Sequence, residues 1–564
     1  MNSLPDGQAE RLFLAIALNE LDGSAATSRA HHTASIIGFF ATAAIFLAVN
    51  PPQGADPAFL GQPSLEHIQE TQDMTAVRIS MLALSATVLA VPCAASTIHV
   101  PADQPTIQAA VTAASNGDVI EIADGTYTEN IVISGKKLTV QPTPGGTCVL
   151  ESSHVSISKA GSPGIAFRGI RFLRSTGSGF GGAIEASDSE VSVSDCSFVG
   201  NSIAGGDGVY GGAAIYVQNC RLTIQSSVMT ENSVNLVTGG YPFAFGGAVL
   251  ADHSVIDVRD SDFLRNACLA TVPGASWAEA RTMGGAIALR WGSGVISNCR
   301  FEENSVRSEV HGVGPLASAL GGAIGATGQP ATSLRINDCI AYRNRTTAIS
   351  DNSAYGGSGS AIGGAFCFGY WNPEGGGSHQ VQDCLFVGNT SDKSPLNNGQ
   401  SVSDIAFLGV DSGSVSRCRF GESAATALTG DAIVGAVVAW GGPQSLLSNS
   451  AFCGLNCVSS ALNVRSQDVS VAANCGDCNG DGIPDIAEIV AGAPDNDADG
   501  IPDACQCTGD LNRDGLVNGS DMGIMLGFWG PTGSVFPQSD INRDGSVDGA
   551  DIGLLLANWG PCPL

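Results

Sequence analysis

The sequence contains few charged side chains, and positive charge is the scarcest. Of its 564 residues, 25 are Lys or Arg and 53 are Asp or Glu, which gives a formal net charge of −28 at pH 7. So few basic residues offer no excess to displace the counterions of a nucleic acid, and we expect no nucleic-acid partner. The same argument excludes an anionic membrane surface as the main partner. Cations are the natural partners of such a chain.

Aromatic residues, at 6%, and prolines, of which there are 25, are also few. Charged residues make up only 14% of the chain, whereas glycine, with 73 residues, and Ser, Thr, Val and Ile are abundant. This composition fits neither collagen, nor a coiled coil, nor a disordered tail. It indicates a β protein with many turns.

Residues 74–96 have the three parts of a secretory signal peptide. Arg78 supplies the positive region, Met81 to Val91 form an apolar stretch, and Cys93-Ala94-Ala95 places small residues at the cleavage positions. Because this signal is internal, we expect the true start at Met74 and residues 1–73 to be a mis-assigned extension. The alternative is a membrane anchor at residues 33–49, an apolar run at the lower limit for spanning a bilayer. Either interpretation predicts a secreted, cell-surface or outer-membrane protein.

A Gly-Gly-Ala signature recurs along the chain, and each copy is followed by a β-prone segment that ends in Asn. The first glycines of the six copies are Gly181, Gly211, Gly246, Gly284, Gly321 and Gly363. The closing asparagines are Asn201, Asn232, Asn266, Asn304, Asn344 and Asn389. The distance from Gly to Asn stays between 20 and 26 residues, while that from Asn to the next Gly varies from 10 to 19. This pattern indicates one structural unit per copy, with an insertion at a single point.

The near-constant arcs are rich in β-branched residues and alternate with a period of two, as in Val191-Ser-Val193-Ser, which excludes a helical array. Such an arc is one coil of a parallel β-solenoid, whose coils stack at about 4.8 Å. Stacking predicts an internal apolar ladder: Phe198, Met229, Phe263, Phe301, Phe386, Phe420 and Phe452. It also predicts a ladder of buried thiols, with disulfides or reactive nucleophiles as the alternative: Cys196, Cys299, Cys339, Cys384 and Cys418. The Asn residues should bond from coil to coil at turns with left-handed backbone.

The paired GGA and FxxN motifs resemble the repeats of polymorphic outer-membrane proteins over about residues 181–455. Upstream, Ile98 to Ile133 resembles the first coils of pectin-lyase-like β-helices, with a helix over Ile107 to Ala114 that caps the open end of the solenoid. The resemblance implies an all-β fold, a right-handed single-stranded parallel β-helix over residues 97–460. We expect roughly eight to ten coils.

A catalytic constellation is not evident in the repeats, because the sequence has neither an Asp-Asp pair nor the segments that carry the aspartates of pectin methylesterases. One column of aspartates does stack, just before the thiol ladder: Asp195, Asp260, Asp338 and Asp383. We interpret it as a set of turn residues, with a cation or sugar contact as the alternative. A catalytic role for the solenoid therefore has no assigned residues.

The variable segments are expected to be loops that carry aromatic residues and project from one face, where solenoids commonly bind partners. The candidate ligand-binding residues are Tyr241, Trp277, Tyr370 and Trp371. Aromatic faces suit stacking on sugar rings, so a glycan or a cell-surface protein is the expected partner. The alternative is that these rings pack their own segments onto the solenoid.

The C-terminal tail is acidic, and two loops in it match the Ca²⁺ template D-x-[DN]-x-[DN]-G. The ligands predicted in the first loop are Asp510, Asn512, Asp514, the carbonyl of Leu516, Asn518 and Asp521. Those in the second are Asp540, Asn542, Asp544, the carbonyl of Ser546, Asp548 and Asp551. Each loop leads into an apolar segment of helical period, with Met522, Met525, Leu526 and Trp529 in the first and Ile552, Leu555, Leu556 and Trp559 in the second.

This duplicated pair, residues 508–564, resembles a type I dockerin, which implies a cohesin-bearing scaffold as partner. The contact positions late in each helix, usually basic in dockerins, are here Gly527-Phe528 and Ala557-Asn558. Residues 475–507 resemble thrombospondin type 3 calcium repeats, and the resemblance implies Asp477, Asn479, Asp481, Asp485, Glu488, Asp495, Asp497, Asp499 and Asp503 as ligands. Six cysteines in this region are expected to form disulfides: Cys457, Cys475, Cys478, Cys505, Cys507 and Cys562.

Together these features predict an exported, calcium-binding β-helix protein that acts in adhesion or in glycan or partner binding, with the tail as its attachment module. The alternative is a secreted polysaccharide lyase or glycoside hydrolase that carries a dockerin. The fold and the tail favour this alternative, and the missing catalytic residues oppose it, because fold analogy alone does not decide function.

Overall fold

The computed structural model describes residues 95–177, 179–313, 315–328, 332–350, 358–369, 376–393, 401–422, 424–425, 436–440, 444–453, 464–472, 475–479, 481–495, 501–505, 509–512, 516–531, 539–542 and 545–562. The predicted extension, and the signal peptide apart from its last two residues, lie outside this set, as does the alternative anchor. Within it, no helix has both the length and the apolar character that a bilayer span requires.

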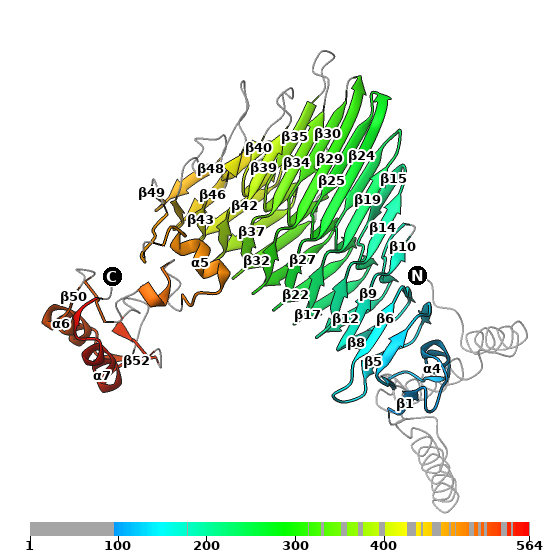
Figure 1. The fold of residues 1–564 in the computed structure, drawn as a ribbon, viewed down its shortest axis with the longest axis horizontal. Coiled ribbons are helices and arrows are strands. Elements are labelled where there is room, and N and C mark those ends of the chain that lie inside the picture. Colours follow the sequence, from blue (N-terminus) through cyan, green and yellow to red (C-terminus); the bar gives the residue numbers. More distant parts are fainter. Residues whose placement is uncertain are drawn as a thin grey trace, which may run out of the picture. The chain divides into compact units, whose positions relative to one another are not determined.

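The body is a parallel β-helix, as the repeats predict (Figure 1). Its strands form five sheets, A to E, and within each sheet every strand pairs in parallel with the equivalent strand of the next coil. A complete coil runs through the sheets in the order A, B, D, E, C. Among the described residues, sheet C contains 10 strands, so ten coils pass through sheets A, B and C, in agreement with the prediction of eight to ten. Sheet A extends beyond these coils by Thr97–Val100 at one end and by Ser445–Ser448 and Val464–Gln467 at the other.

Sheets A, B and C form the three-sided tube. Sheet A consists of β1 (Thr97–Val100), β2 (Val119–Ile122), β5 (Leu138–Pro142), β8 (Ile165–Arg168), β12 (Glu190–Ser194), β17 (Arg221–Gln225), β22 (Val255–Arg259), β27 (Ser293–Ser297), β32 (Ser333–Asn337), β37 (Ser378–Gln382), β42 (Ser412–Ser416), β46 (Ser445–Ser448) and β48 (Val464–Gln467). Sheet B consists of β3 (Gly125–Tyr127), β6 (Cys148–Glu151), β9 (Ile170–Leu173), β13 (Ser197–Val199), β18 (Val228–Thr230), β23 (Asp262–Leu264), β28 (Arg300–Glu302), β33 (Ile340–Tyr342), β38 (Leu385–Val387), β43 (Arg419–Gly421), β47 (Ala451–Cys453) and β49 (Ser470–Ala472). Sheet C consists of β4 (Ile131–Ser134), β7 (Val155–Ser158), β11 (Ile184–Ser187), β16 (Ile215–Gln218), β21 (Val249–Asp252), β26 (Ile287–Arg290), β31 (Ile324–Thr327), β36 (Phe366–Gly369), β41 (Ile405–Leu408) and β45 (Val437–Trp440).

Sheets D and E are built from the variable segments and are called the fin. Sheet D consists of β10 (Thr176–Gly177), β14 (Ser202–Gly205), β19 (Ser233–Val237), β24 (Ala267–Ser276), β29 (Ser305–Val313), β34 (Arg345–Ser350), β39 (Thr390–Lys393) and β44 (Ala424–Ala425). Sheet E consists of β15 (Gly208–Gly211), β20 (Pro242–Phe245), β25 (Glu279–Met283), β30 (Leu316–Leu320), β35 (Ser358–Ile362) and β40 (Ser401–Val402). The fin rises above the tube in the upper part of Figure 1.

The variable segments are thus paired strands and not loops. The fin has its own hydrophobic cluster, composed mostly of alanines and Val and Ile side chains. Small side chains let sheets D and E approach closely, so each insertion buries its own apolar residues. The projection from one face is confirmed, but the predicted loop conformation is wrong, because these short segments pair with one another along the solenoid.

The predicted apolar ladder fills the tube. Its members are 3% exposed or less, and consecutive rings stack, as Phe420 and Phe452 do with centroids 4.4 Å apart. The ladder is interrupted at Ala341, and Phe366 from sheet C fills the space, 6.1 Å edge-on from Phe301. A volume deficit in one sheet is therefore compensated from another, which keeps the core close-packed.

The asparagine ladder bonds from coil to coil, as predicted. The Nδ2 of Asn304 donates to Oδ1 of Asn344 at 3.0 Å, and the other pairs span 2.8–3.0 Å. The left-handed residue is the one before each Asn, such as Glu303 with φ +53°, so the predicted backbone conformation was wrong by one position. The fully buried Asn side chain satisfies backbone groups inside the turn, while its neighbour absorbs the tight bend.

The GGA motif forms the turn where the chain returns from the fin to sheet C. Its first glycine has φ between +60° and +66° in all six copies, namely Gly181, Gly212, Gly246, Gly284, Gly321 and Gly363. The second copy therefore begins at Gly212 and not at Gly211. A Cβ on the second glycine, Gly285, would lie 2.7 Å from the amide nitrogen of Ser305, the residue after the Asn. Five of the six copies have glycine at this second position, where a side chain would crowd the neighbouring backbone, and the second copy has Ala213 there.

Helix α4 (Ile107–Ala113) covers the N-terminal end of the tube, as predicted. The carboxylate of Glu129 accepts hydrogen bonds from the amides of Ile107 and Gln108, both at 3.0 Å. The ammonium of Lys136 donates to the carbonyls of Val111, Thr112 and Ala114 at 2.7–2.8 Å. The solenoid thus supplies a group of the favourable sign to each end of the helix dipole.

The C-terminal part contains three α-helices, α5 (Asp485–Ala491), α6 (Gly519–Gly527) and α7 (Gly549–Ala557), and a 3₁₀ turn η1 (Asp503–Cys505). Two antiparallel pairs join the duplicated halves: β50 (Leu516–Val517) with β53 (Gly560–Pro561), and β51 (Gly530–Pro531) with β52 (Ser546–Val547). A small core of Val517, Met525, Val547 and Leu555 lies between them. Leu526, Trp529, Leu556 and Trp559, expected in the apolar stripe, are about half exposed.

Candidate calcium loops and binding surfaces

The loop over residues 540–551 has the sharp turn that the template places at its sixth position. Gly545 at its sixth position has φ +93°, and its amide donates to Oδ2 of Asp540 at 2.9 Å. Asp551 at the twelfth position is fully buried and accepts from the amides of Asn542 and Asp548, at 3.0 and 2.8 Å. These bonds fix the carboxylates of Asp540 and Asp551, and hard oxygen donors of this kind suit Ca²⁺. Asp544 lies outside the described residues.

The loop over residues 510–521 holds the aspartate at its twelfth position in the same way. Asp521 is fully buried and accepts from the amides of Asn512 and Asn518, at 3.0 and 2.9 Å. Asp510 and Leu516 lie in the described part of the loop, and Asp514 does not. At the ninth position, Asn518 also caps α6 by accepting from the amide of Ser520 at 2.7 Å. Asp548 caps α7 in the same way, a role that the ligand template does not reveal.

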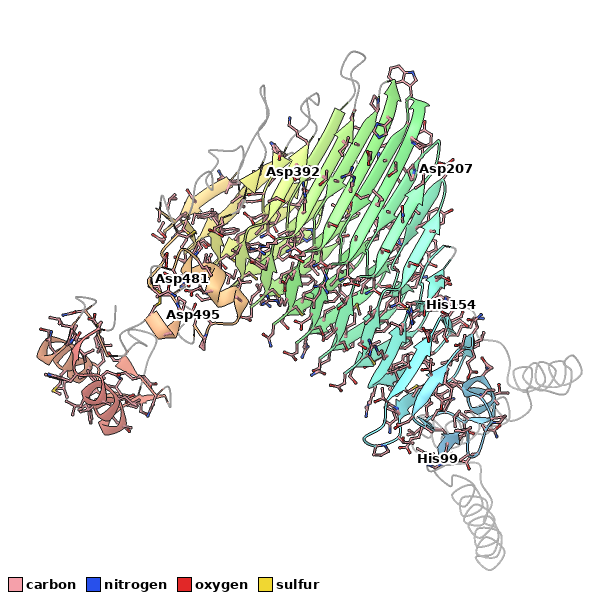
Figure 2. The ribbon with its side chains drawn as sticks, viewed as in Figure 1. His99, His154, Asp207, Asp392, Asp481 and Asp495 are labelled. Atoms are coloured by element: carbon pink, nitrogen blue, oxygen red, sulfur yellow. A yellow bond between two sulfur atoms is a disulfide. The ribbon has the colours of Figure 1, made fainter. Side chains whose placement is uncertain are left out.

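The loop over residues 477–488 has the same turn as the loop over residues 540–551. Gly482 has φ +88° and its amide donates to Oδ2 of Asp477 at 2.9 Å. Glu488 accepts from Nδ2 of Asn479 at 2.8 Å through Oε1, while its buried Oε2 has no hydrogen-bond partner among the described residues. Asp485 is 5% exposed. Asp481, next to α5 in Figure 2, accepts through Oδ1 from the amide of Ile483 at 2.8 Å.

Two sulfur atoms lie beside these carboxylates. The Sγ atoms of Cys478 and Cys505 and the carboxylates of Asp485 and Glu488 all lie within 4.8 Å of one another. The two cysteines form a disulfide, however, so no thiolate is available as a metal ligand there. The donors for a cation are therefore oxygens.

The second thrombospondin-like loop is described only at its ends. Asp495 is described, Asp497 and Asp499 lie outside the described residues, and Asp503 lies in η1.

The disulfides of this region agree in part with the prediction. Cys478 pairs with Cys505, while Cys475 pairs with Cys453, a residue that was not among the six expected. Cys562 is also disulfide-bonded. Cys457 and Cys507 lie outside the described residues. The nine remaining described cysteines are buried and free, and burial raises the pKa of Cys196 to about 12, which makes a nucleophilic role unfavourable.

The fin carries two exposed aromatic side chains at its edge, Tyr241 at 53% and Trp277 at 68%. The hydroxyl of Tyr241 donates to the carbonyl of Trp277 at 3.3 Å. Asp207, labelled on the fin in Figure 2, accepts from the amide of Tyr241 at 2.7 Å and from Oγ1 of Thr238 at 2.8 Å. The two rings thus face solvent from a hydrogen-bonded edge. The other candidates, Tyr370 and Trp371, lie outside the described residues.

The aspartate column lies in the turns between sheets A and B. Asp195, Asp260, Asp338 and Asp383 have φ between +51° and +54°, the left-handed conformation that Asp tolerates. Arg417 donates to both carboxylate oxygens of Asp383, at 2.7 and 2.8 Å, and thereby lowers the pKa of that carboxyl. Burial and the neighbouring Asp383 raise the pKa of Asp338. The backbone conformation accounts for the column as turn residues.

The outer face of sheet A has a shallow groove of about 410 Å³ across five coils. Arg221, Asp257, Arg335 and Gln380 line it together with serines of the same strands. Asp257 is the only carboxylate in this lining, and Arg259 donates to both of its oxygens at 2.7 Å. Hydrolysis by general acid and base uses a pair of carboxylates, and this groove lacks the second one.

Residues 508–558 match the family model of the dockerin type I domain. No curated protein matches the chain. The match covers both loops whose geometry is described above, together with α6 and α7. Type I dockerins in general bind calcium and cohesin partners.

Proposed function

We propose that this protein is an exported, calcium-binding β-helix that binds a glycan or a cell-surface protein through its fin and is held on a cohesin-bearing scaffold by its dockerin. Residues 97–460 are assigned to the β-helix, 475–507 to thrombospondin type 3-like loops and 508–564 to the dockerin. The similarity of the repeats to polymorphic outer-membrane proteins supports a place at the cell surface. The match of residues 508–558 to a dockerin carries the proposal.

Calcium supplies positive charge to the carboxylates of the tail. In the loop over residues 540–551, the residues that would hold the ion are Asp540, Asn542, Asp544, Ser546 through its carbonyl, Asp548 and Asp551. The chain's own contribution is the turn at Gly545 and the amides that orient Asp551. The same roles fall to the equivalent residues of the first loop.

The attachment role is tested by titrating the full chain with a type I cohesin module in a calorimeter. We expect saturable binding with Ca²⁺ and none with EGTA. Because the usual basic contact positions are here Gly527-Phe528 and Ala557-Asn558, the half-exposed Leu526, Trp529, Leu556 and Trp559 provide the contact area instead. Absence of binding in millimolar Ca²⁺ would remove cohesin from the proposal.

The binding role of the fin is tested on a glycan array with the double variant Tyr241→Ala/Trp277→Ala. The matched control is Val237→Ala, which removes an exposed aliphatic side chain from the same fin. We expect the aromatic variant to lose binding and the control to keep it, because only aromatic faces stack on sugar rings. Equal binding by all three proteins would contradict the assignment.

The second candidate function is a polysaccharide lyase or glycoside hydrolase, favoured by the groove on sheet A. A single carboxylate in its lining, already paired with Arg259, opposes it. Incubation with acidic and neutral polysaccharides, with detection of new reducing ends and unsaturated products, distinguishes the two. We expect no turnover, and sustained product formation would establish the enzyme.

A further inference from the structure

Helix α5 lies on the outer face of sheet B. The outward residues of β28 are Arg300 and Glu302, whereas those of β33 and β38 are apolar: Ile340, Tyr342, Leu385 and Val387. Ile486 and Val490 of α5, 6% and 0% exposed, form a cluster with this apolar patch. The outer face of sheet B changes from charged to apolar where the helix covers it, so the helix belongs to the body of the solenoid.

Two further contacts fix the helix. A Cβ on Gly421 would lie 2.9 Å from Cγ2 of Ile486 and 3.1–3.2 Å from the sulfurs of the Cys453–Cys475 disulfide, so this glycine forms a notch for all three. Nη1 of Arg300 donates to the carbonyl of Val490 at 2.6 Å. Because α5 has no basic residue in its own last turn, the solenoid supplies the cation that its C-terminus favours.

The first turn of the same helix carries the last two ligand positions of the loop over residues 477–488. Asp485 and Glu488 come from this turn, and Asp485 is 5% exposed. One side of α5 therefore contacts sheet B while its N-terminal turn completes the loop. A seven-residue helix is a single rigid element, so displacing it from sheet B also displaces both carboxylates.

We infer that Ca²⁺ binding to the loop over residues 477–488 and docking of α5 on sheet B are one coupled event. The inference rests on the proposed calcium role of this loop. Calcium then stabilises the last coils of the solenoid, and docking in turn raises the affinity of the loop for calcium, because coupling between two sites is reciprocal. The loop acts as a calcium-dependent latch on the solenoid, distinct from the dockerin loops.

The first arm of the test compares the full chain with Asp481→Ala, which removes an exposed ligand, and with Asp540→Ala, which removes one from the dockerin. Amide hydrogen exchange is followed in peptides that cover β38, β43 and β47, with β13 and β18 as reference strands. We expect Ca²⁺ to slow exchange in the three C-terminal strands of the wild type and of Asp540→Ala, but not of Asp481→Ala. The reference strands should be unaffected in all three.

The number of calcium ions bound, measured by calorimetry, distinguishes a failure of the coupling from a failure of the calcium site. If Asp481→Ala binds one ion fewer than the wild type but calcium leaves exchange in β38, β43 and β47 unchanged, the coupling is wrong and the calcium site stands. If Asp481→Ala binds as many ions as the wild type, the site itself is wrong.

The second arm disturbs docking without touching a ligand. Ile486→Ser removes the side chain that occupies the Gly421 notch, and Arg300→Met removes the donor to Val490. We expect either change to weaken calcium binding at this loop about fivefold or more, with the dockerin sites unchanged. Unaltered affinity in both variants would overturn the coupling.

Discussion

Nδ2 of Asn266 donates to Oδ1 of Asn304, one coil further along the solenoid, at 3.0 Å. The same oxygen accepts from the backbone amide of Asn266 at 2.9 Å. One buried oxygen thus satisfies two buried donors, and Asn304 repeats the pattern on Asn344. The ladder is therefore a continuous chain in which each side chain is both donor and acceptor.

Replacement of Asn304 by Ala should strongly destabilise the solenoid. It leaves the backbone amide of Asn266 and one of its two Nδ2 hydrogens buried without an acceptor, while the carbonyl of Met229 still accepts from the other. Each unsatisfied group costs about 1–3 kcal/mol. Urea unfolding measures the loss. Asn235→Ala, which truncates an exposed Asn on β19, is the control and should change stability little. Equal midpoints for the two variants would show that the ladder does not stabilise the fold.

The capping helix should depend on Lys136. Lys136→Met removes the three hydrogen bonds that the ammonium donates to carbonyls at the end of α4. A hydrogen bond that involves a charged group contributes about 1.5–3 kcal/mol to stability. We expect faster amide exchange in α4 and β1, with the fin unchanged. Lys159→Met, at an exposed position on the same tube, is the matched control. If the amides of α4 exchange as slowly in Lys136→Met as in the wild type, the stabilising role of Lys136 is wrong.

The fold could be predicted from the sequence because a stacked solenoid repeats its ladders in the sequence. Residues equivalent to Phe263 and Asn266 occur in every coil that carries the motif, or are replaced there by residues of similar role. What the sequence did not reveal depends on contacts between coils or on distant segments. The segment Gly211-Gly212-Ala213-Ala214 of the second copy can be aligned with the other copies in two registers. The left-handed backbone of Gly212 shows which register is the structural one.

Compensating contacts were the least predictable part of the structure. Phe366 fills the space at Ala341 from another sheet, and Arg300 caps a helix 190 residues away in sequence. The turns of the loops over residues 477–488 and 540–551 could be predicted directly, because the residues of each template are close in sequence and their spacing follows from one turn. The docking of α5 could not, since the apolar positions Ile340 and Leu385 look like ordinary strand residues.

The pH dependence of stability should contain a contribution from His379. This side chain is 1% exposed and stacks on Phe368, and burial lowers its pKa to about 4. Between about pH 4 and pH 6.5, the imidazole of His379 is protonated in the unfolded chain but neutral in the native state. Stability is therefore lost as pH falls through this window.

The variant His379→Phe tests this contribution. We expect the fall in unfolding midpoint from pH 6.5 to pH 4.5 to be smaller than in the wild type. His154 is the internal contrast, because its contact with Glu185 raises its pKa and its stabilising contribution is present below pH 6.5 and lost above. NMR titration should show His154 charging first on acidification. A normal titration of His379 near pH 6.5 would contradict its burial.

Two glycine substitutions in the second dockerin loop should have opposite effects. Gly545 has φ +93° and Gly553 lies within α7, and a Cβ at either position would meet no atom within 4 Å. Sterically equivalent substitutions thus differ only in backbone conformation. Gly545→Ala forces a left-handed alanine, at about 1–2 kcal/mol, and should weaken calcium binding about tenfold.

Gly553→Ala replaces a helical glycine by the best helix former, which is favourable by about 1 kcal/mol, so it should preserve or strengthen calcium binding. Calorimetric titration with Ca²⁺ after EGTA treatment measures both affinities, and far-UV circular dichroism reports the helix that calcium orders. If both variants weaken binding equally, the turn at Gly545 is not what positions Asp540, because a nonspecific response to added methyl groups would explain the result. Opposite signs tie calcium affinity to the left-handed turn, which the loop over residues 477–488 also has at the same position, at Gly482.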